Sequence, residues 1–308
     1  MDISVVVPAY NEEESLQELI QKLSHILHDL DKKCEIIIVD DGSTDQTLAT
    51  SKELKKDFPL LKILSFRKNY GKSAALSEAF KLSDGDYVIT MDADLQDDPK
   101  EIPNLISALE SGNYDLVSGW KKKRHDPISK TVPSRIFNFV TAKISGINIH
   151  DFNCGLKIYR KEVAKDLKIY GELHRFLPVL AHWNGFRVGE IAVQHHPRKF
   201  GKTKFGISRF FNGFFDLLTV LFVTRYQTSP LHIFGMLGLI SAIFGFAIEI
   251  YLSILWFMGE GIRNRPLFFL GILAIIVGIQ FVVFGLLGEM ITARFAEQTH
   301  YSIKERIE

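Results

Sequence analysis

The sequence predicts an α/β fold in which a mostly parallel sheet is joined to a C-terminal hairpin of two transmembrane helices. Short β-rich runs alternate with helix-like stretches over the first hundred residues, which is typical of a parallel sheet with helices on both faces. Two long apolar stretches occupy the last third of the 308-residue chain. A bilayer core of ~30 Å needs about 20 apolar residues as a helix, and both stretches meet that length.

The expected strands share β-branched runs, and the expected helices fall between them. The strands are at 3–8, 35–40, 61–66 and 86–92, and the helices are near 12–30, 45–57, 71–83 and 99–110. Open sheets of this kind bind ligands at the carboxyl ends of their strands. We therefore expect a site among the residues that follow each strand.

Composition excludes several classes of protein. Charged residues make up 24% of the chain and hydrophobic residues 46%, which excludes a disordered or fibrous protein. There are 37 Lys and Arg against 36 Asp and Glu, so the net charge of +1 gives no indication of a nucleic-acid partner. Cys34 and Cys154 are too few for a disulfide framework and favour a reducing compartment.

The two apolar stretches carry small residues at helical spacing. The first, 231–258, contains Gly238, Ala242 and Gly245, and the second, 267–287, contains Gly271, Gly278 and Gly285. Small residues let two helix backbones approach closely, so a packed hairpin is expected. The first stretch has a single formal charge, Glu249. We expect its side chain to snorkel towards the membrane interface, with an intramembrane role as the alternative.

Basic residues indicate the orientation of the hairpin. They gather before the first apolar stretch and in the tail, whereas the connecting loop has only Arg263 and Arg265. The positive-inside rule then places the large N-terminal part in the cytoplasm, with the hairpin in the cytoplasmic (inner) membrane. No signal peptide is visible. The expected organisation is a cytoplasmic domain over 1–205, interfacial amphipathic helices over 206–228, two transmembrane helices over 229–292 and a cytoplasmic tail over 293–308.

Acidic residues stand at the ends of the expected strands. The first strand ends in PAYNE, the second in Asp40-Asp41-Gly42-Ser43, and the fourth in Asp92-Ala93-Asp94-Leu95-Gln96. Converging carboxylates repel one another unless a cation or a hydrogen-bond donor lies among them. Oxygen ligands suit Mg²⁺ or Mn²⁺, and Mg²⁺ usually takes one or two protein carboxylates and completes its shell with phosphate oxygens. The sequence therefore predicts a metal-bound diphosphate at this edge.

Each motif also has a structural interpretation. Asp97 and Asp98 before Pro99 could begin a helix, and Ser43 could cap the helix after a simple turn. His195-His196 is better explained as a polar strand end than as half of a zinc site. A G-x-G-x-x-G motif does not follow the first strand, and Phe66 stands where a P-loop ending at Gly71 would need glycine.

Eight ordered motifs carry a resemblance to a known family. They are VVVPAYNEEESL, VDDGSTDQT, RKNYGKSAAL, MDADLQDDP, PSRIFN, DFNCGLKIYR, LHRFLP and HHPRKFGKTKF. The chain resembles the family-2 glycosyltransferases with a GT-A fold. Within them it is similar to the membrane-anchored polyprenyl-phosphate enzymes, which include dolichyl-phosphate mannose synthases and bacterial undecaprenyl-phosphate glucosyltransferases. The resemblance covers essentially the whole chain.

The resemblance implies roles for individual residues. The nucleoside would contact Pro8, Ala9, Tyr10, Glu12, Asp40, Asp41, Asp92 and Ala93, with Asp40 reading the base. A Mg²⁺ or Mn²⁺ ion would bind Asp92, Asp94 and Gln96. Asp94, Arg198 and Lys204 would be catalytic, the two cations closing over the diphosphate. The acceptor phosphate would contact Lys121, Arg124, Ser134 and Arg135, although the family often has Arg at the position of Lys121.

The reaction implied is inverting transfer of a hexose from UDP-glucose to a polyprenyl phosphate. GDP-mannose or another UDP-sugar is the alternative donor. A phosphate monoester is mostly ionised near pH 7, so it needs no strong general base, and catalysis reduces to positioning and charge neutralisation. A processive polysaccharide synthase is disfavoured, because it would need more membrane spans and a QxxRW motif, and the sequence shows neither. A protein that binds a sugar nucleotide without turnover is the alternative function. The chain could also form a homo-oligomer.

Overall fold

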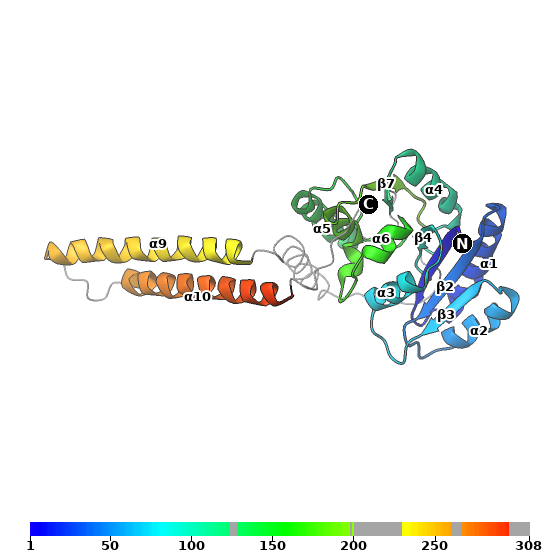
Figure 1. Ribbon diagram of the computed structural model, residues 1–308, viewed down its shortest axis with the longest axis horizontal. Helices are drawn as coiled ribbons and strands as arrows, with labels where there is room; N and C mark the ends of the chain where they lie inside the picture. Colours follow the sequence, from blue (N-terminus) through cyan, green and yellow to red (C-terminus); the bar gives the residue numbers. More distant parts are fainter. Residues whose placement is uncertain (123–127, 198, 200–229, 260–265, 296–308) are drawn as a thin grey trace, which may run out of the picture. The chain divides into compact units, whose positions relative to one another are not determined.

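The computed structural model describes residues 1–122, 128–197, 199, 230–259 and 266–295 (Figure 1). The chain divides into two compact units, Met1–Leu217 and Leu218–Glu308. Three predicted site residues, Arg124, Arg198 and Lys204, lie outside the described residues, as do the predicted interfacial helices and residues 296–308 of the predicted tail.

The first unit is built on a seven-stranded sheet with the order β3-β2-β1-β4-β6-β5-β7. Its strands are Ile3–Ala9 (β1), Cys34–Asp40 (β2), Leu61–Ser65 (β3), Tyr87–Thr90 (β4), Leu116–Trp120 (β5), Lys157–Arg160 (β6) and Val188–Ala192 (β7). Among these described strands, β6 alone runs antiparallel to its neighbours, β4 and β5. The predicted mostly parallel sheet and its first four strands are confirmed.

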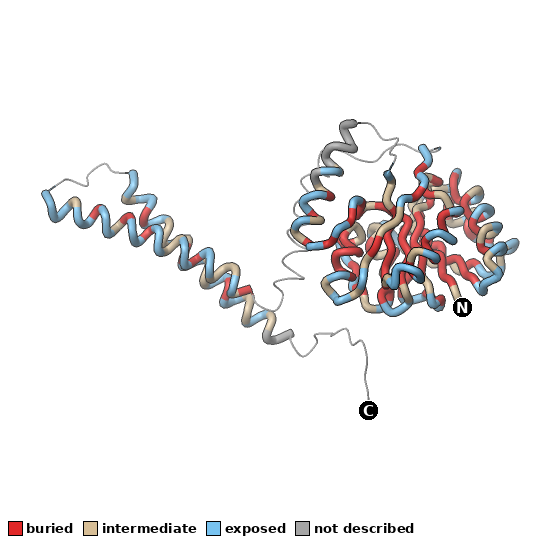
Figure 2. The backbone as a smooth tube through the Cα atoms, turned by 90° about the horizontal axis from the view of Figure 1, so that it is seen from above, coloured by how far each residue is buried: buried red, intermediate tan, exposed pale blue. Residues whose placement is uncertain are grey.

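Helices follow most of the strands. They are Glu13–Asp29 (α1), Thr47–Asp57 (α2), Lys72–Leu82 (α3), Ile102–Ser111 (α4), Ile128–Ser145 (α5), Lys161–Asp166 (α6) and Leu177–Trp183 (α7), with 3₁₀ turns at Pro99–Glu101 (η1) and Leu173–Arg175 (η2). The first four agree closely with the predicted helices. In Figure 2 the strands are buried while the outer faces of the helices are exposed.

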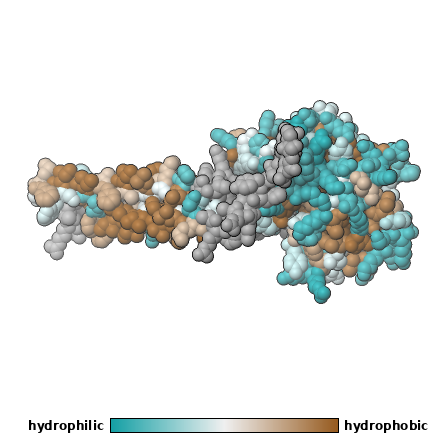
Figure 3. All heavy atoms as spheres, in the orientation of Figure 1, coloured by the Kyte–Doolittle hydropathy of each residue, from teal (hydrophilic) through white to brown (hydrophobic). Residues whose placement is uncertain are grey.

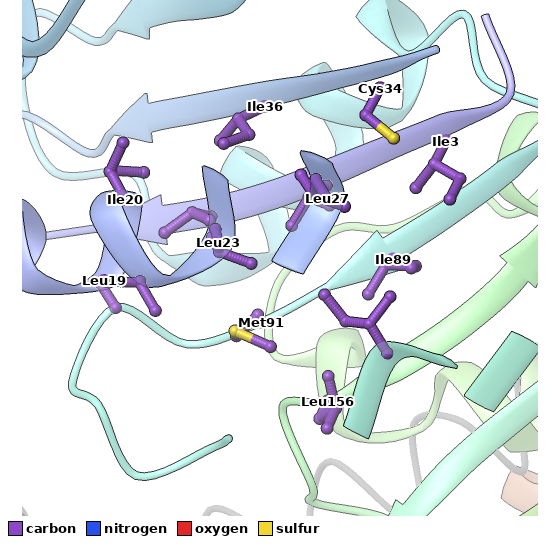
Figure 4. Close-up of a cluster of buried hydrophobic side chains, with 14 of the residues drawn as sticks. Ile3, Leu19, Ile20, Leu23, Leu27, Cys34, Ile36, Ile89, Met91 and Leu156 are labelled. Atoms are coloured by element: carbon purple, nitrogen blue, oxygen red, sulfur yellow. The ribbon is translucent and has the colours of Figure 1, made fainter. Parts of the chain in front are cut away.

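Helix α1 shows how the core fixes the sheet. Leu19, Ile20, Leu23 and Leu27 lie at helical spacing on its inner face, and all are buried. They pack over the strands beside residues such as Met91 (Figure 4). Burying each such side chain stabilises the fold by about 1.5–3 kcal/mol. The packing holds the carboxyl ends of β1, β2 and β4 at one edge.

The second unit is a hairpin of Pro230–Phe257 (α9) and Pro266–Phe295 (α10). The two helices lie side by side in Figures 1 and 2, and both are long and apolar enough to cross a membrane. A Cβ added at Gly238 would lie 2.5 Å from the carbonyl oxygen of Gly278, and one at Gly245 would lie 2.6 Å from that of Gly271. The predicted close packing is confirmed. The outer surface is largely apolar (Figure 3).

Glu249 does not extend to the end of its helix. Its Oε1 atom is buried with no hydrogen-bond partner among the described residues. A Cβ added at Gly271 would collide with this atom, so the carboxyl group fills the space that glycine leaves on α10. The Glu249 carboxyl group therefore lies against α10 at Gly271, and its position relative to the membrane interface stays a prediction.

Candidate active site

A cleft of about 350 Å³ opens at the carboxyl edge of the sheet. Eight residues predicted to bind nucleotide or metal line it: Pro8, Ala9, Tyr10, Glu12, Asp41, Asp92, Ala93 and Asp94. They come from the ends of β1, β2 and β4, strands that are neighbours in the sheet. The cleft therefore lies at the strand ends, where the sequence predicted a site, and it brings these eight residues together.

Asp40 and Asp41 have different positions at the end of β2. Asp40 is buried and is not among the described residues that line the cleft, and its carboxylate accepts hydrogen bonds from Ser43 N at 3.0 Å and Ser65 Oγ at 2.7 Å. Asp41 lines the cleft and accepts from the backbone N–H groups of Tyr70 at 2.7 Å and Gly71 at 2.9 Å. Burial raises the pKa of Asp41 despite these two bonds.

The turn after Asp41 requires glycine. Gly42 has φ +67°, and a Cβ there would lie 2.3 Å from the carbonyl carbon of Lys68. Ser43 does not cap the next helix, because its Oγ accepts from Asn11 N at 3.0 Å and α2 begins only at Thr47. The turn instead joins the loops after β1 and β2.

Asp92 is ion-paired with Lys72, the first residue of α3. Burial raises the pKa of a carboxyl, but the charge and hydrogen bond of Lys72 outweigh it and lower the pKa of Asp92 to about 2. On the other side, a Cβ added at Gly155 would lie 2.5 Å from Asp92 Cγ. Asp92 is thus ionised at neutral pH and held between a cation and a glycine.

The loop after Asp92 has a strained backbone. Leu95 has φ 60°, a conformation that costs a non-glycine residue roughly 1–2 kcal/mol. Its neighbour Asp94 lines the cleft and accepts from Gln96 N at 3.2 Å. Of the described residues, Gln96 is not among those that line the cleft, and its carbonyl oxygen accepts from His196 N at 2.8 Å.

Lys121 lies against Asp97. The two charged groups are 2.9 Å apart, and their side chains are 14% and 0% exposed. Burial lowers the pKa of Lys121, but the attraction of Asp97 outweighs it and the pKa is raised. Asp98, not Asp97, caps η1 by accepting from Lys100 N, as the structural interpretation of that motif predicted.

His195, His196 and the described acceptor residues Lys121, Ser134 and Arg135 are not among the residues that line the cleft. His195 pairs with Asp97 in an isolated antiparallel β-bridge beyond the end of β7 at Ala192, and His196 Nε2 is 3.0 Å from Asp98 Oδ2, so both histidines lie after the strand rather than at its end. On α5, Ser134 is half-buried and Arg135 is exposed.

Several cleft residues were not assigned a role from the sequence. They are Asn69, Gly71, Lys72, Lys157, His174 and Arg175, among others. Lys157 is 3% exposed, its ammonium donates to the carbonyl oxygen of Cys154, and burial lowers its pKa. Lys157 begins the short strand β6, and its burial could not be read from the sequence, because lysine is rarely buried without a partner.

Comparison with known proteins identifies the family. The family described as "Glycosyl transferase family 2" matches residues 4–168. The chain is 38% identical over 300 residues to dodecaprenyl-phosphate galacturonate synthase of Rhizobium johnstonii, covering 96% of this chain and 89% of the relative. The chain belongs to glycosyltransferase family 2.

A second relative and a solved structure also match this family-2 glycosyltransferase. The chain is 36% identical over 293 residues to undecaprenyl-phosphate 4-deoxy-4-formamido-L-arabinose transferase of Salmonella choleraesuis, covering 94% of this chain and 88% of the relative. Glucosyl-3-phosphoglycerate synthase from Mycobacterium tuberculosis, solved with Mn²⁺, UDP and phosphoglyceric acid, has a TM-score of 0.57 at 20% identity, covering 72% of this chain and 78% of that chain. This likeness confirms the predicted GT-A fold.

Proposed function

We propose that this glycosyltransferase transfers a sugar from a nucleoside-diphosphate sugar to a polyprenyl phosphate at the cytoplasmic membrane surface. The observation that carries the proposal is that one chain joins an acidic cleft to two helices long enough to cross a bilayer. A polyprenyl phosphate keeps its tail in the bilayer, so an enzyme that acts on its phosphate gains from an anchor. The relatives named for dodecaprenyl and undecaprenyl phosphate match 96% and 94% of the chain, the hairpin included.

The nucleotide proposed is UDP, bound along the cleft between the loops after β1 and β2. Asp41, the residue after β2, lines the cleft, so it joins Asp40 as a candidate for base contact. The sequence resemblance predicts glucose as the sugar. Because the two relatives are named for galacturonate and 4-deoxy-4-formamido-L-arabinose, glucose is one member of the donor panel to be tested.

A divalent ion, Mg²⁺ or Mn²⁺, fits the cleft. Asp92 and Asp94 both line it, and the low pKa of Asp92 keeps that carboxylate charged. No group of three or more His, Cys, Asp or Glu able to hold a metal occurs among the described residues, which suits an ion that completes its shell with phosphate oxygens. Bound there, the ion would neutralise charge on the departing diphosphate. Gln96 stays a predicted third ligand.

The remaining residues would position the two anionic substrates. Ser134 and Arg135 are the proposed ligands of the acceptor phosphate on α5, with Arg124 before them. Lys121 stays in this predicted set, although Asp97 already compensates its charge. Arg198 and Lys204 are proposed to close over the diphosphate. In-line attack by the phosphate oxygen on the anomeric carbon would invert its configuration and needs no strong general base.

A donor panel tests the proposal. The purified full-length chain would be incubated in lipid nanodiscs with undecaprenyl phosphate, Mn²⁺ or Mg²⁺ and single UDP- or GDP-sugars, and products would be identified by mass. We expect a polyprenyl-phosphate sugar from at least one donor. Calorimetric binding of UDP without any glycolipid across the panel would instead support a binding protein without turnover.

A further inference from the structure

The hydrogen bonds to one hydroxyl group assign a tautomer to His174 in η2. Ser73 Oγ accepts a hydrogen bond from His174 N at 3.1 Å and lies 3.0 Å from His174 Nδ1. Among the described residues, Nδ1 is the acceptor within reach of the Ser73 hydroxyl proton. An imidazole that accepts at Nδ1 carries its own proton on Nε2. The ring therefore has Nε2–H as its remaining polar group.

The environment of the ring keeps it neutral. Burial, reinforced by the charges of Lys72 and Arg175, lowers the pKa of His174 to about 3. The residue lines the cleft, and no described residue forms a hydrogen bond with Nε2. His174 thus offers the cleft one uncharged N–H donor throughout the physiological pH range.

His174 belongs to a group of donors on the cleft wall. We call the basic wall Lys72, Lys157, His174 and Arg175, all of which line the cleft. Lys72, Lys157 and Arg175 are near enough to lower the pKa of His174. Arg175 is 13% exposed and pairs through Nη2 with Glu172 at 2.9 Å. These side chains donate hydrogen bonds and, apart from the neutral imidazole, accept none.

A surface made of donors selects for a ligand group made of acceptors. A sugar hydroxyl both donates and accepts, whereas an ionised carboxylate only accepts. A buried carboxylate is costly unless cations and hydrogen-bond donors surround it. We propose that the basic wall binds a carboxylate on the donor sugar, so that the substrate class is a nucleoside-diphosphate uronate and His174 is a specificity-determining residue. This rests on the proposed function.

The direct test is competition between acidic and neutral donors. The full-length chain in nanodiscs with undecaprenyl phosphate would receive equimolar UDP-galacturonate, UDP-glucuronate, UDP-galactose and UDP-glucose, with products quantified by mass. A hydrogen bond to a charged group contributes roughly 1.5–3 kcal/mol, so we expect kcat/KM for one uronate to exceed that of its neutral counterpart at least about tenfold. Equal or greater transfer from the neutral sugars would overturn the inference.

Variants separate carboxylate recognition from general binding. His174→Ala should lower the ratio of kcat/KM for the uronate to that for its neutral counterpart about tenfold, and His174→Gln, which retains an N–H donor, should restore part of it. His182→Ala, at an exposed histidine on α7, should leave the ratio unchanged. Retained UDP affinity by calorimetry would show that the variants are folded.

The outcomes distinguish two kinds of failure. If His174→Ala lowers kcat/KM equally for acidic and neutral donors, the wall serves the diphosphate that all donors share, and the uronate inference is wrong. If the wild-type chain transfers no sugar from any donor, the proposed function itself has failed.

Discussion

Lys72 and Asp92 form an ion pair that joins the first turn of α3 to the loop after β4. Both residues line the cleft, so this acidic loop is compensated by a cation from a separate element. The pair explains why Asp92 stays ionised while partly enclosed. It also places an ammonium group on the basic wall, where a carboxylate of the donor sugar is proposed to bind.

Removing this cation should weaken donor binding. We expect Lys72→Ala to raise the KM for the sugar nucleotide about tenfold, since a hydrogen bond to a charged group contributes roughly 1.5–3 kcal/mol. Lys72→Arg should recover part of the loss. Lys52→Ala, an exposed lysine on α2, is the matched control. An unchanged KM in Lys72→Ala would remove Lys72 from the donor site.

Gly155 leaves the space that the Asp92 carboxylate occupies. In Gly155→Ala the new Cβ would lie 2.5 Å from Asp92 Cγ, so the carboxylate must shift. We expect kcat/KM to fall at least about tenfold, because small misplacements of binding groups are costly. Gly235→Ala, whose nearest neighbour would be Leu231 Cδ1 at 3.5 Å, is the control. Steady-state kinetics of the two variants decide whether the position of Asp92 matters.

The buried pair of Lys121 and Asp97 should contribute mainly to stability. Breaking a buried pair leaves one charge uncompensated, so Asp97→Ala should lower the free energy of unfolding by about 3–5 kcal/mol. The double variant Lys121→Met with Asp97→Leu should recover much of this in chemical denaturation. If the double variant is stable yet has a strongly raised KM for polyprenyl phosphate, Lys121 also contacts the acceptor, as the sequence resemblance implies.

His174 should make the fold sensitive to acid. Its folded pKa of about 3 lies below the ordinary value of 6.5. Between these values the unfolded chain binds a proton that the folded chain does not, so the free energy of unfolding falls as pH drops below 6.5, by at most about 1.4 kcal/mol per unit. Melting temperatures of the wild type and His174→Gln from pH 7 to 4.5 should diverge, with the variant less acid-sensitive. Parallel curves would mean that the folded imidazole is protonated as well.

The hairpin should depend on its glycine contacts. A Cβ at Gly278 would lie 2.6 Å from the carbonyl oxygen of Gly238, so Gly278→Val must separate α9 and α10. Overpacking of this kind costs typically about 1–3 kcal/mol. We expect a lower melting temperature in detergent than for Gly235→Ala. An unaltered melting temperature would argue against close backbone contact at this crossing.

The fold and part of the site could be predicted from the sequence where the local residue pattern agrees with the rule that ligands bind at strand ends. The Ile- and Val-rich runs located β1 and β2, and the rule for strand ends placed Asp41 and Asp94 in one cleft. The short strands β5 to β7 were not predicted, because Leu116–Trp120 contains glycine and serine and Lys157–Arg160 has only four residues, two of them basic.

The remaining site residues depend on contacts between distant parts of the chain. His174 meets Ser73 across 101 positions, and no local pattern encodes that distance. Lys121 lies near Asp97 only because β5 is placed in the sheet beyond β4 and β6. The position of the Glu249 carboxyl group likewise depends on the space that Gly271 leaves on the other helix. Such pairings emerge from packing, so their chemistry becomes readable only in the folded chain.

The central claim is that carboxylates at the sheet edge support sugar transfer to a lipid phosphate. The most direct test measures polyprenyl-phosphate sugar formed by the wild type, Asp94→Ala and Asp57→Ala, which removes an exposed carboxylate at the end of α2. The account predicts product from the wild type and Asp57→Ala, and a loss of about a hundredfold or more in folded Asp94→Ala. Undiminished product from Asp94→Ala would contradict it.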